Sequence, residues 1–139
     1  MRGNKCADTR PEMLVRRLLH RLGYRYRTHV KDFPGRPDLV FSKRRVVVQV
    51  HGCFWHQHAD PSCTLRSKPK GNTDYWSAKL ARNVERDAEQ AQALAERGWQ
   101  TVIVWECQCS DEARLQATLT QLLGPPRRGL PATQLQPDP

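Results

Sequence analysis

The sequence has no long apolar run and no room for a second full domain. No segment approaches the roughly 18 apolar residues that cross a bilayer, and the first twenty residues lack the apolar segment of a signal peptide. We therefore expect a cytoplasmic protein with no membrane partner. Because the chain has 139 residues, we expect one domain over residues 1–124, followed by a disordered tail over residues 125–139.

Acidic residues are scarce beside basic ones, and the cysteines are odd in number. The chain has 14 Asp and Glu against 23 Lys and Arg, a net charge of +9. Such an excess favours a polyanionic partner, above all nucleic acid, although a well-solvated basic surface has the same composition. Among the five cysteines, those close to histidines favour metal binding over disulfides in a reducing compartment.

The first half of the chain predicts a helix and three strands. Thr9-Arg10-Pro11-Glu12 has the form of a capping box, and leucines at i+4 spacing extend the helix to about Gly23. Strands are predicted over 24–30, 39–41 and 46–50. The last is a β-branched run typical of a strand buried on both faces.

The second half predicts a helix, a strand and a helix, over 73–97, 99–105 and from Ser110 onward. The apolar faces expected for the two helices consist of Trp76, Leu80, Val84, Ala88, Ala91 and Ala95, and of Leu115, Leu119 and Leu122. The order α-β-β-β-α-β-α indicates an α/β domain with a central mixed sheet flanked by helices. Parallel pairing is expected only across the long helical crossover.

Asp38 is the first candidate for chemistry. It stands at the start of a predicted strand after a Pro-Gly loop, and the neighbouring strand ends at Val50 and His51. A carboxylate beside a backbone carbonyl and a histidine suits a hard cation such as Mg²⁺. An Asp after proline is equally common as a strand cap, so the pattern leaves both roles open.

A cluster of thiols and imidazoles on the loop after residue 50 predicts a tetrahedral Cys₃His zinc site. Its four ligands are Cys53, His58, Cys63 and Cys107. Cys109 could replace Cys107 and His56 could replace His58, and unrelated thiols remain an alternative. With all four positions filled by protein, this zinc is expected to be structural.

Bulky aromatics beside cations form a third cluster. Phe54, Trp55 and Trp76 lie among basic residues, namely Arg66, Lys68, Lys70, Lys79 and Arg82. A protein that wedges between base pairs while gripping phosphate needs such residues, so we expect the three aromatics, Lys68 and Lys70 to bind DNA. Core packing is the competing role, and it is favoured for Trp99 and Trp105.

Asn83 and Asp87 are spaced i, i+4 on the long helix and share a face. We expect Asn83 to hydrogen-bond a loop and to take part in DNA binding, and Asp87 to orient a histidine.

With these motifs in place, the sequence resembles the very short patch repair endonucleases, which have the restriction-endonuclease-like fold. The matching motifs span most of residues 9–107. They are Pro11-Glu12, Pro34-Gly35-Arg36-Pro37-Asp38, His51-Gly52-Cys53-Phe54-Trp55-His56, Asn83-Val84-Glu85-Arg86-Asp87 and Val104-Trp105-Glu106-Cys107.

The resemblance implies an enzyme that nicks one DNA strand 5′ to the thymine of a T:G mismatch, the lesion left when 5-methylcytosine is deaminated. It also implies a bacterial protein that acts at the nucleoid, and we expect a monomer without naming a protein partner. A zinc-stabilised module that binds DNA without cutting, and a relative that cuts both strands in a defence setting, are the competing hypotheses.

The resemblance also assigns roles to residues. Asp38 would bind Mg²⁺ together with the carbonyl of Val50, and His51 would take the place that lysine holds in most relatives of this fold. Glu12 would support the site through waters, although its capping-box role stays open.

His56 would act as general base or orient the attacking water, with Asp87 fixing its ring. Phe54, Trp55 and Trp76 would insert beside the mismatch. The segment 58–63 is longer than the shortest version in the family, so Cys63 needs a bulge to reach the zinc.

Overall fold

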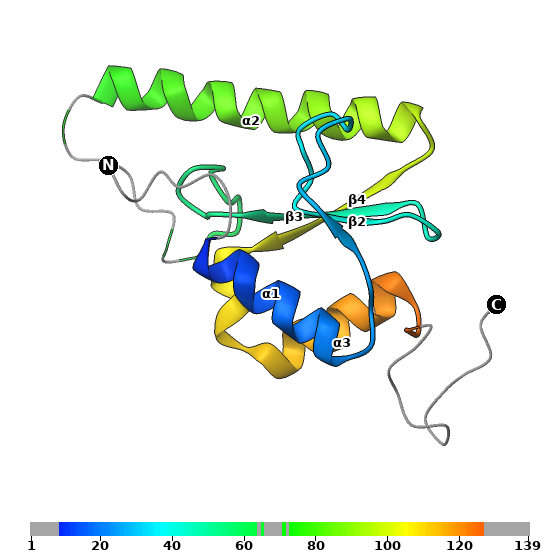
Figure 1. The fold of residues 1–139 in the computed structure, drawn as a ribbon. Helices are drawn as coiled ribbons and strands as arrows, with labels where there is room; N and C mark the ends of the chain where they lie inside the picture. The colour runs from blue at the N-terminus through cyan, green and yellow to red at the C-terminus, as the bar shows by residue number, and fades with distance from the viewer. Residues whose placement is uncertain (1–8, 64, 66–70, 72, 127–139) are drawn as a thin grey trace.

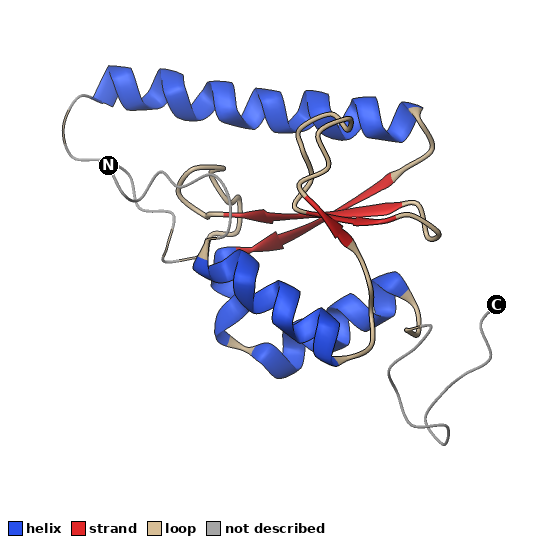
Figure 2. Cartoon of the chain, viewed as in Figure 1, coloured by secondary structure: helices blue, strands red, loops and turns tan. Residues whose placement is uncertain are grey.

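A computed structural model describes residues 9–63, 65, 71 and 73–126. Its elements are α1 (Arg10–Arg21), β1 (Arg27–Thr28), β2 (Leu39–Phe41), β3 (Val46–His51), α2 (Thr73–Glu96), β4 (Gln100–Trp105), the 3₁₀ helix η2 (Glu106–Ser110) and α3 (Glu112–Leu123). The strands form one sheet, with α2 over one face and α1 and α3 over the other (Figures 1 and 2). The predicted order of elements and the α/β class are confirmed.

Strand pairing determines which residues meet at the sheet edge. The order is β1-β2-β3-β4, with β1–β2 and β2–β3 antiparallel and β3–β4 parallel. The parallel pair is the one joined through α2, as predicted. The start of β2 therefore lies beside the ends of β3 and β4, which brings Asp38, His51 and Trp105 to one edge.

The valines of β3 separate two hydrophobic clusters. Val46 and Val48 face α1 and α3 and join the larger cluster, which includes Leu18 and Leu119. Val47 faces α2 and packs with Val40 and Leu94. Burial on both faces, predicted from the β-branched run, is confirmed.

The predicted strand over 24–30 is wrong in length, because only Arg27–Thr28 pairs with β2. Tyr24 is fully buried in the larger cluster, and its hydroxyl donates to the Gly124 carbonyl. The Tyr26 hydroxyl donates to the Arg16 carbonyl at 2.8 Å. These aromatics pack against helices, and His29, with φ 49°, ends the strand.

Four apolar positions predicted for helix faces are wrong, because Val84, Ala88 and Ala95 on α2 and Leu122 on α3 are exposed. Val84 is 43% exposed, whereas Leu94 carries the contact of α2 with the sheet. At 1.5 Å per residue α2 is about 36 Å long, against about 20 Å for a six-residue strand, so part of its apolar face meets no sheet. In α3, Leu123 is buried and Leu122 is exposed, because the i+4 repeat from Leu115 leads to 123.

Residues 127–139 lie outside the described residues, so the division into a domain over 1–124 and a tail over 125–139 stays a prediction. Within the described part, no helix is long and apolar enough to cross a membrane.

Candidate active site

Asp38 is held at the sheet edge by the neighbouring strand. The Val50 N–H donates to Asp38 Oδ2 at 2.7 Å, which leaves Oδ1 on the side of His29. Burial raises the pKa of Asp38 to about 6; the Val50 hydrogen bond opposes the rise, and the charge of Glu12 adds to it. Asp38 is thus a largely buried carboxylate whose charged form a nearby cation would stabilise.

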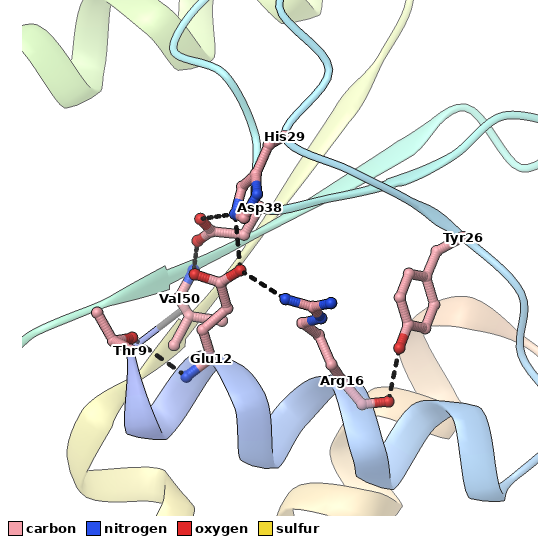
Figure 3. Close-up of polar contacts among 7 residues, drawn as sticks. All are labelled: Thr9, Glu12, Arg16, Tyr26, His29, Asp38 and Val50. Carbon is pink, nitrogen blue, oxygen red and sulfur yellow. Dashed lines mark hydrogen bonds and ion pairs between the residues drawn. The ribbon is translucent and has the colours of Figure 1, made fainter. Parts of the chain in front are cut away.

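Glu12 is the second carboxylate at this edge, and its side chain is only 2% exposed. Its Oε2 lies 2.7 Å from His29 Nε2 and 3.6 Å from Arg16 Nη1 (Figure 3). The Thr9 hydroxyl accepts the Glu12 N–H at 3.3 Å, so Thr9 caps the helix as predicted. Glu12 thus occupies the helix cap with its backbone and the sheet edge with its carboxylate.

His29 is a site residue that sequence reasoning missed. The pairing of Thr28 with Leu39 places His29 beside Asp38, and its Nε2 lies 4.0 Å from Asp38 Oδ1. The imidazole therefore bridges two carboxylates that are 26 positions apart in the sequence. No local pattern marks this residue, because both contacts depend on strand register and on the packing of α1.

Two stacked histidines follow at the end of β3. The rings of His51 and His56 lie 3.8 Å apart at 9°. His56 Nδ1 is 2.6 Å from Asp87 Oδ2, the contact predicted for Asp87, and this carboxylate leaves Nε2 as the nitrogen that accepts a proton. Burial, then the charge of His56, lowers the pKa of His51 to about 4, so His51 is neutral at pH 7.

The aromatic cluster consists of Phe54, Trp55 and Trp76, all partly exposed. Trp55 lies 5.0 Å from Phe54 and 5.7 Å from Trp76, between ring centroids. Asn83 Nδ2 donates to the Trp55 carbonyl at 3.0 Å, so the predicted contact of Asn83 with a loop is confirmed. Asn83 and Asp87 together fix the segment 55–56 to α2.

Several expected DNA contacts cannot be placed. Arg66, Lys68 and Lys70 lie outside the described residues. On α2, Lys79 and Arg82 line a hollow beside the aromatic cluster with Tyr75, Asn83 and Arg86. Cations and aromatics are thus adjacent on this surface.

The predicted zinc residues come together in space. The ligand atoms of Cys53, His58, Cys63 and Cys107 all lie within 4.8 Å of one another. Cys107 Sγ is 3.5 Å from His58 Nδ1, close to the separation of about 3.6 Å that tetrahedral Zn–S and Zn–N bonds require. Cys109 packs instead against the larger hydrophobic cluster.

A turn at Asp60 positions one of these ligands, Cys63. Asp60 accepts from the Ser62 N–H at 2.9 Å and from the Cys63 N–H at 3.0 Å, through its side chain and its carbonyl respectively. This turn bends the segment so that Cys63 Sγ lies near the other three ligand atoms. Burial raises the pKa of the Cys53 thiol to about 12, so deprotonation requires the charge of a bound cation.

Trp105 was predicted to lie in the hydrophobic core, and the structure places it elsewhere. It is only partly buried, its ring stacks on His58 at 4.2 Å and it meets His51 edge-on at 5.2 Å. Trp105 therefore separates the cysteine cluster from the histidine pair. Trp99 does pack against the smaller hydrophobic cluster, as predicted.

The raised pKa of the Asp38 carboxyl predicts that the stability of the protein depends on pH when no divalent ions are added. The folded pKa of Asp38, about 6, lies above the ordinary 3.8, so the folded state binds this proton more tightly and loses stability as pH rises from about 4 to 6. The pKa difference corresponds to at most about 3 kcal/mol. Asp38→Asn, which keeps an acceptor for Val50, should therefore exceed the parent in stability at pH 7.

Urea unfolding followed by circular dichroism checks this. The gain of Asp38→Asn should shrink toward zero as pH falls to 4, and the contribution of His51 cancels because both proteins contain it. Asp32→Asn, an exposed change on the neighbouring loop, is the matched control and should not exceed the parent in stability at pH 7. A loss of stability in Asp38→Asn at pH 7 would contradict the electrostatic account.

Comparison with known proteins agrees with this arrangement. A family model described as DNA mismatch endonuclease Vsr matches residues 1–63. The Type II nicking enzyme V.XorIIP of Xanthomonas oryzae is 49% identical over 121 residues, 87% of each chain. The DNA mismatch endonuclease Vsr of Escherichia coli is 41% identical over 107 residues, 77% of this chain and 67% of the relative.

A further relative, the Type II nicking enzyme V.NmeAIP of Neisseria meningitidis, is 41% identical over 116 residues, 84% of this chain and 81% of the relative. Carboxylates and a histidine pair lie at one sheet edge, and these relatives are nicking enzymes and a mismatch endonuclease. The chain is therefore a DNA endonuclease. It belongs to the Vsr family of DNA mismatch endonucleases.

Proposed function

We propose that this chain nicks one DNA strand 5′ to the thymine of a T:G mismatch left by deamination of 5-methylcytosine, and so starts very short patch repair. The observation that carries the proposal is the direct connection between two sites. The segment 54–56 bears two aromatics of the exposed cluster and then His56, which contacts Asp87 at 2.6 Å. A segment that enters the base stack would thus be covalently continuous with the group that handles the proton.

The restriction-endonuclease-like fold is part of this proposal. A mixed sheet with helices on both faces and an acidic residue at the start of β2 supports it. We assign the whole activity to a monomer, because all the proposed catalytic groups come from one chain.

The residues at Asp38 fit a divalent cation. Asp38 and the carbonyl of Val50 would hold Mg²⁺, with Glu12 close by, and oxygen ligands are those that Mg²⁺ prefers. Burial and, to a smaller extent, the charge of Glu12 raise the pKa of Asp38, and a bound cation would stabilise the charged form of both carboxylates. When bound, the ion would stabilise charge on the scissile phosphate.

The chain's own groups would perform the remaining steps. His56 would accept the proton of the attacking water at Nε2, and Asp87 would stabilise the imidazolium that forms. His51 would occupy the place of the lysine found in most relatives of this fold. Because its pKa is about 4, it would act as a neutral ring that fixes His56 by stacking.

Phe54, Trp55 and Trp76 would wedge beside the mismatch, with Lys68, Lys70 and Asn83 contacting the surrounding DNA. Unstacking a base step costs a few kcal/mol, and a T:G pair reduces that cost. Selectivity would therefore come in part from the energy needed to open the step.

Zinc would be structural, held by the Cys53, His58, Cys63 and Cys107 ligand set. Four protein ligands leave no position for water or substrate. The ion would clamp the segment after β3 to the segment after β4, where Cys53 accepts the Cys107 N–H at 3.4 Å.

The test compares two end-labelled duplexes that differ only in T:G against C:G, with Mg²⁺ and zinc-loaded protein. Nicking of the T:G duplex should be at least about 10-fold faster, because a difference of 1.4 kcal/mol in unstacking gives that factor. Equal rates on both duplexes would refute the mismatch preference. No cutting of either would refute the nickase itself.

A further inference from the structure

Three side chains that could bind a metal ion, those of Glu12, His29 and Asp38, come from different elements and meet at the sheet edge. Glu12 comes from α1, His29 follows β1 and Asp38 precedes β2, and their side chains point toward one another (Figure 3). One ligand atom from each lies within 4.8 Å of the other two. The closest pair is Glu12 Oε2 and His29 Nε2 at 2.7 Å.

The backbone of His29 has a strained conformation, and the side chain contacts Glu12. Its φ of 49° is left-handed, a conformation that costs a non-glycine residue about 1 kcal/mol or more. A strand could have ended without this turn, yet the turn brings the imidazole to Glu12 and Asp38. Backbone strain of this kind is common at ligand sites.

The hydrogen bond from Val50 fixes which oxygen of Asp38 faces the cluster. Asp38 Oδ2 accepts from Val50, so Oδ1 is the oxygen that faces His29 at 4.0 Å. The Glu12 side chain is 2% exposed and that of Asp38 is 13% exposed, so both carboxylates are shielded from water. Two shielded carboxylates with one imidazole form a donor set of two oxygens and one nitrogen.

We propose that Glu12, His29 and Asp38 bind the divalent ion of this centre directly, with His29 Nε2 as its nitrogen ligand. This rests on the function proposed above and changes its ion site in two ways. Glu12 becomes a direct ligand where the resemblance implies action through water. The ion also acquires a ligand that Mg²⁺ seldom takes from proteins.

The donor set has a consequence for metal preference. Mg²⁺ favours oxygen ligands and retains its waters, whereas imidazole favours transition-metal dications, and Mn²⁺ accepts both nitrogen and oxygen. The site should therefore bind Mn²⁺ at least about 10-fold more tightly than Mg²⁺. A hydrogen bond between His29 and Glu12 that only supports the fold would place no nitrogen on the ion.

The experiment is Mn²⁺ binding to the zinc-loaded full chain without DNA, followed by the loss of the free-ion electron paramagnetic resonance signal. Electron spin echo modulation of the bound Mn²⁺ reports a coordinated nitrogen directly. The parent should show nitrogen coupling, which changes frequency when histidine is labelled with ¹⁵N. This result needs no variant and so does not depend on the folding of one.

Three substitutions identify the histidine. His29→Gln should abolish the nitrogen coupling and weaken Mn²⁺ binding by about 10- to 100-fold. Glu12→Gln should weaken binding and retain the coupling. His20→Gln removes an exposed imidazole near the other end of α1 and should leave both measurements unchanged.

Some results would overturn the proposal. These are a parent spectrum without nitrogen coupling, coupling that survives in His29→Gln, or equal affinity for Mn²⁺ and Mg²⁺. The proposed function fails separately: a chain that nicks T:G duplexes without nitrogen coupling refutes this ion site alone. A chain that has the coupling but cuts no DNA refutes the nickase alone.

Discussion

Replacing Asp38 by alanine should reduce the rate of strand nicking by at least about 10³-fold, because an ion that stabilises the phosphate contributes several kcal/mol and each 1.4 kcal/mol is tenfold. Affinity for the T:G duplex should change little, since Asp38 is not one of the aromatic or basic residues proposed to bind it. Single-turnover nicking and fluorescence anisotropy measure the two quantities on the same protein.

Asp32→Asn is the matched control, since it removes an exposed carboxylate on the loop that leads to β2. It should nick at the parent rate. If Asp38→Ala retained more than a tenth of the parent rate, Asp38 could not be a ligand of the catalytic ion.

The second large effect concerns the cysteine cluster. Cys53→Ser should lose the zinc and lower the melting temperature by about 10 °C or more, since loss of a structural metal site removes several kcal/mol of folding free energy. Nicking should fall with it, because Cys53 lies three residues before His56. Metal analysis by mass spectrometry and thermal unfolding by circular dichroism measure the outcome, with one zinc per chain expected in the parent.

Cys109→Ser is the control for this prediction. Cys109 packs against the larger hydrophobic cluster, and its Sγ is not among the four grouped ligand atoms. This variant should retain one zinc and lose only the stability of a partly buried thiol. If it lost the zinc while Cys107→Ser kept it, the assignment of ligands would be reversed.

The fold was predictable where the sequence signal is long and periodic. The run of valines in β3 and the 24-residue helix α2 both have the predicted type and nearly the predicted bounds. The strand predicted over 24–30 was too long, because alternating aromatics serve strand pairing and core packing equally well. Tyr24 and Tyr26 pack against helices, which no local pattern distinguishes.

Some residues of the candidate site could likewise be predicted from the sequence, and others could not. Asp38, His56 and Asp87 could be named from sequence because each lies in a recognisable motif, and the contact between His56 and Asp87 is present. His29 could not, since its position depends on strand register. Which of Cys107 and Cys109 lies with the other three ligand atoms also required coordinates. On a 3₁₀ helix, residues two apart point about 120° apart, so only one of them can face the cluster.

The segment 51–58 thus combines neighbouring residues that the account assigns to different functions. Cys53 and His58 belong to the proposed zinc ligand set. His51 and His56 stack beside Asp87, and Phe54 and Trp55 contact Trp76. Trp105 lies between the first two groups. A displacement of the aromatic pair would therefore move His56, and under the proposed function this movement would couple mismatch binding to cleavage.

The most direct test of that account is to map the nick on a T:G duplex labelled separately on each strand. We predict one cut, in the thymine strand and immediately 5′ to the mismatched thymine, with the guanine strand intact. Cuts in both strands, or cuts whose position does not follow the thymine when the mismatch is moved along the duplex, would contradict it.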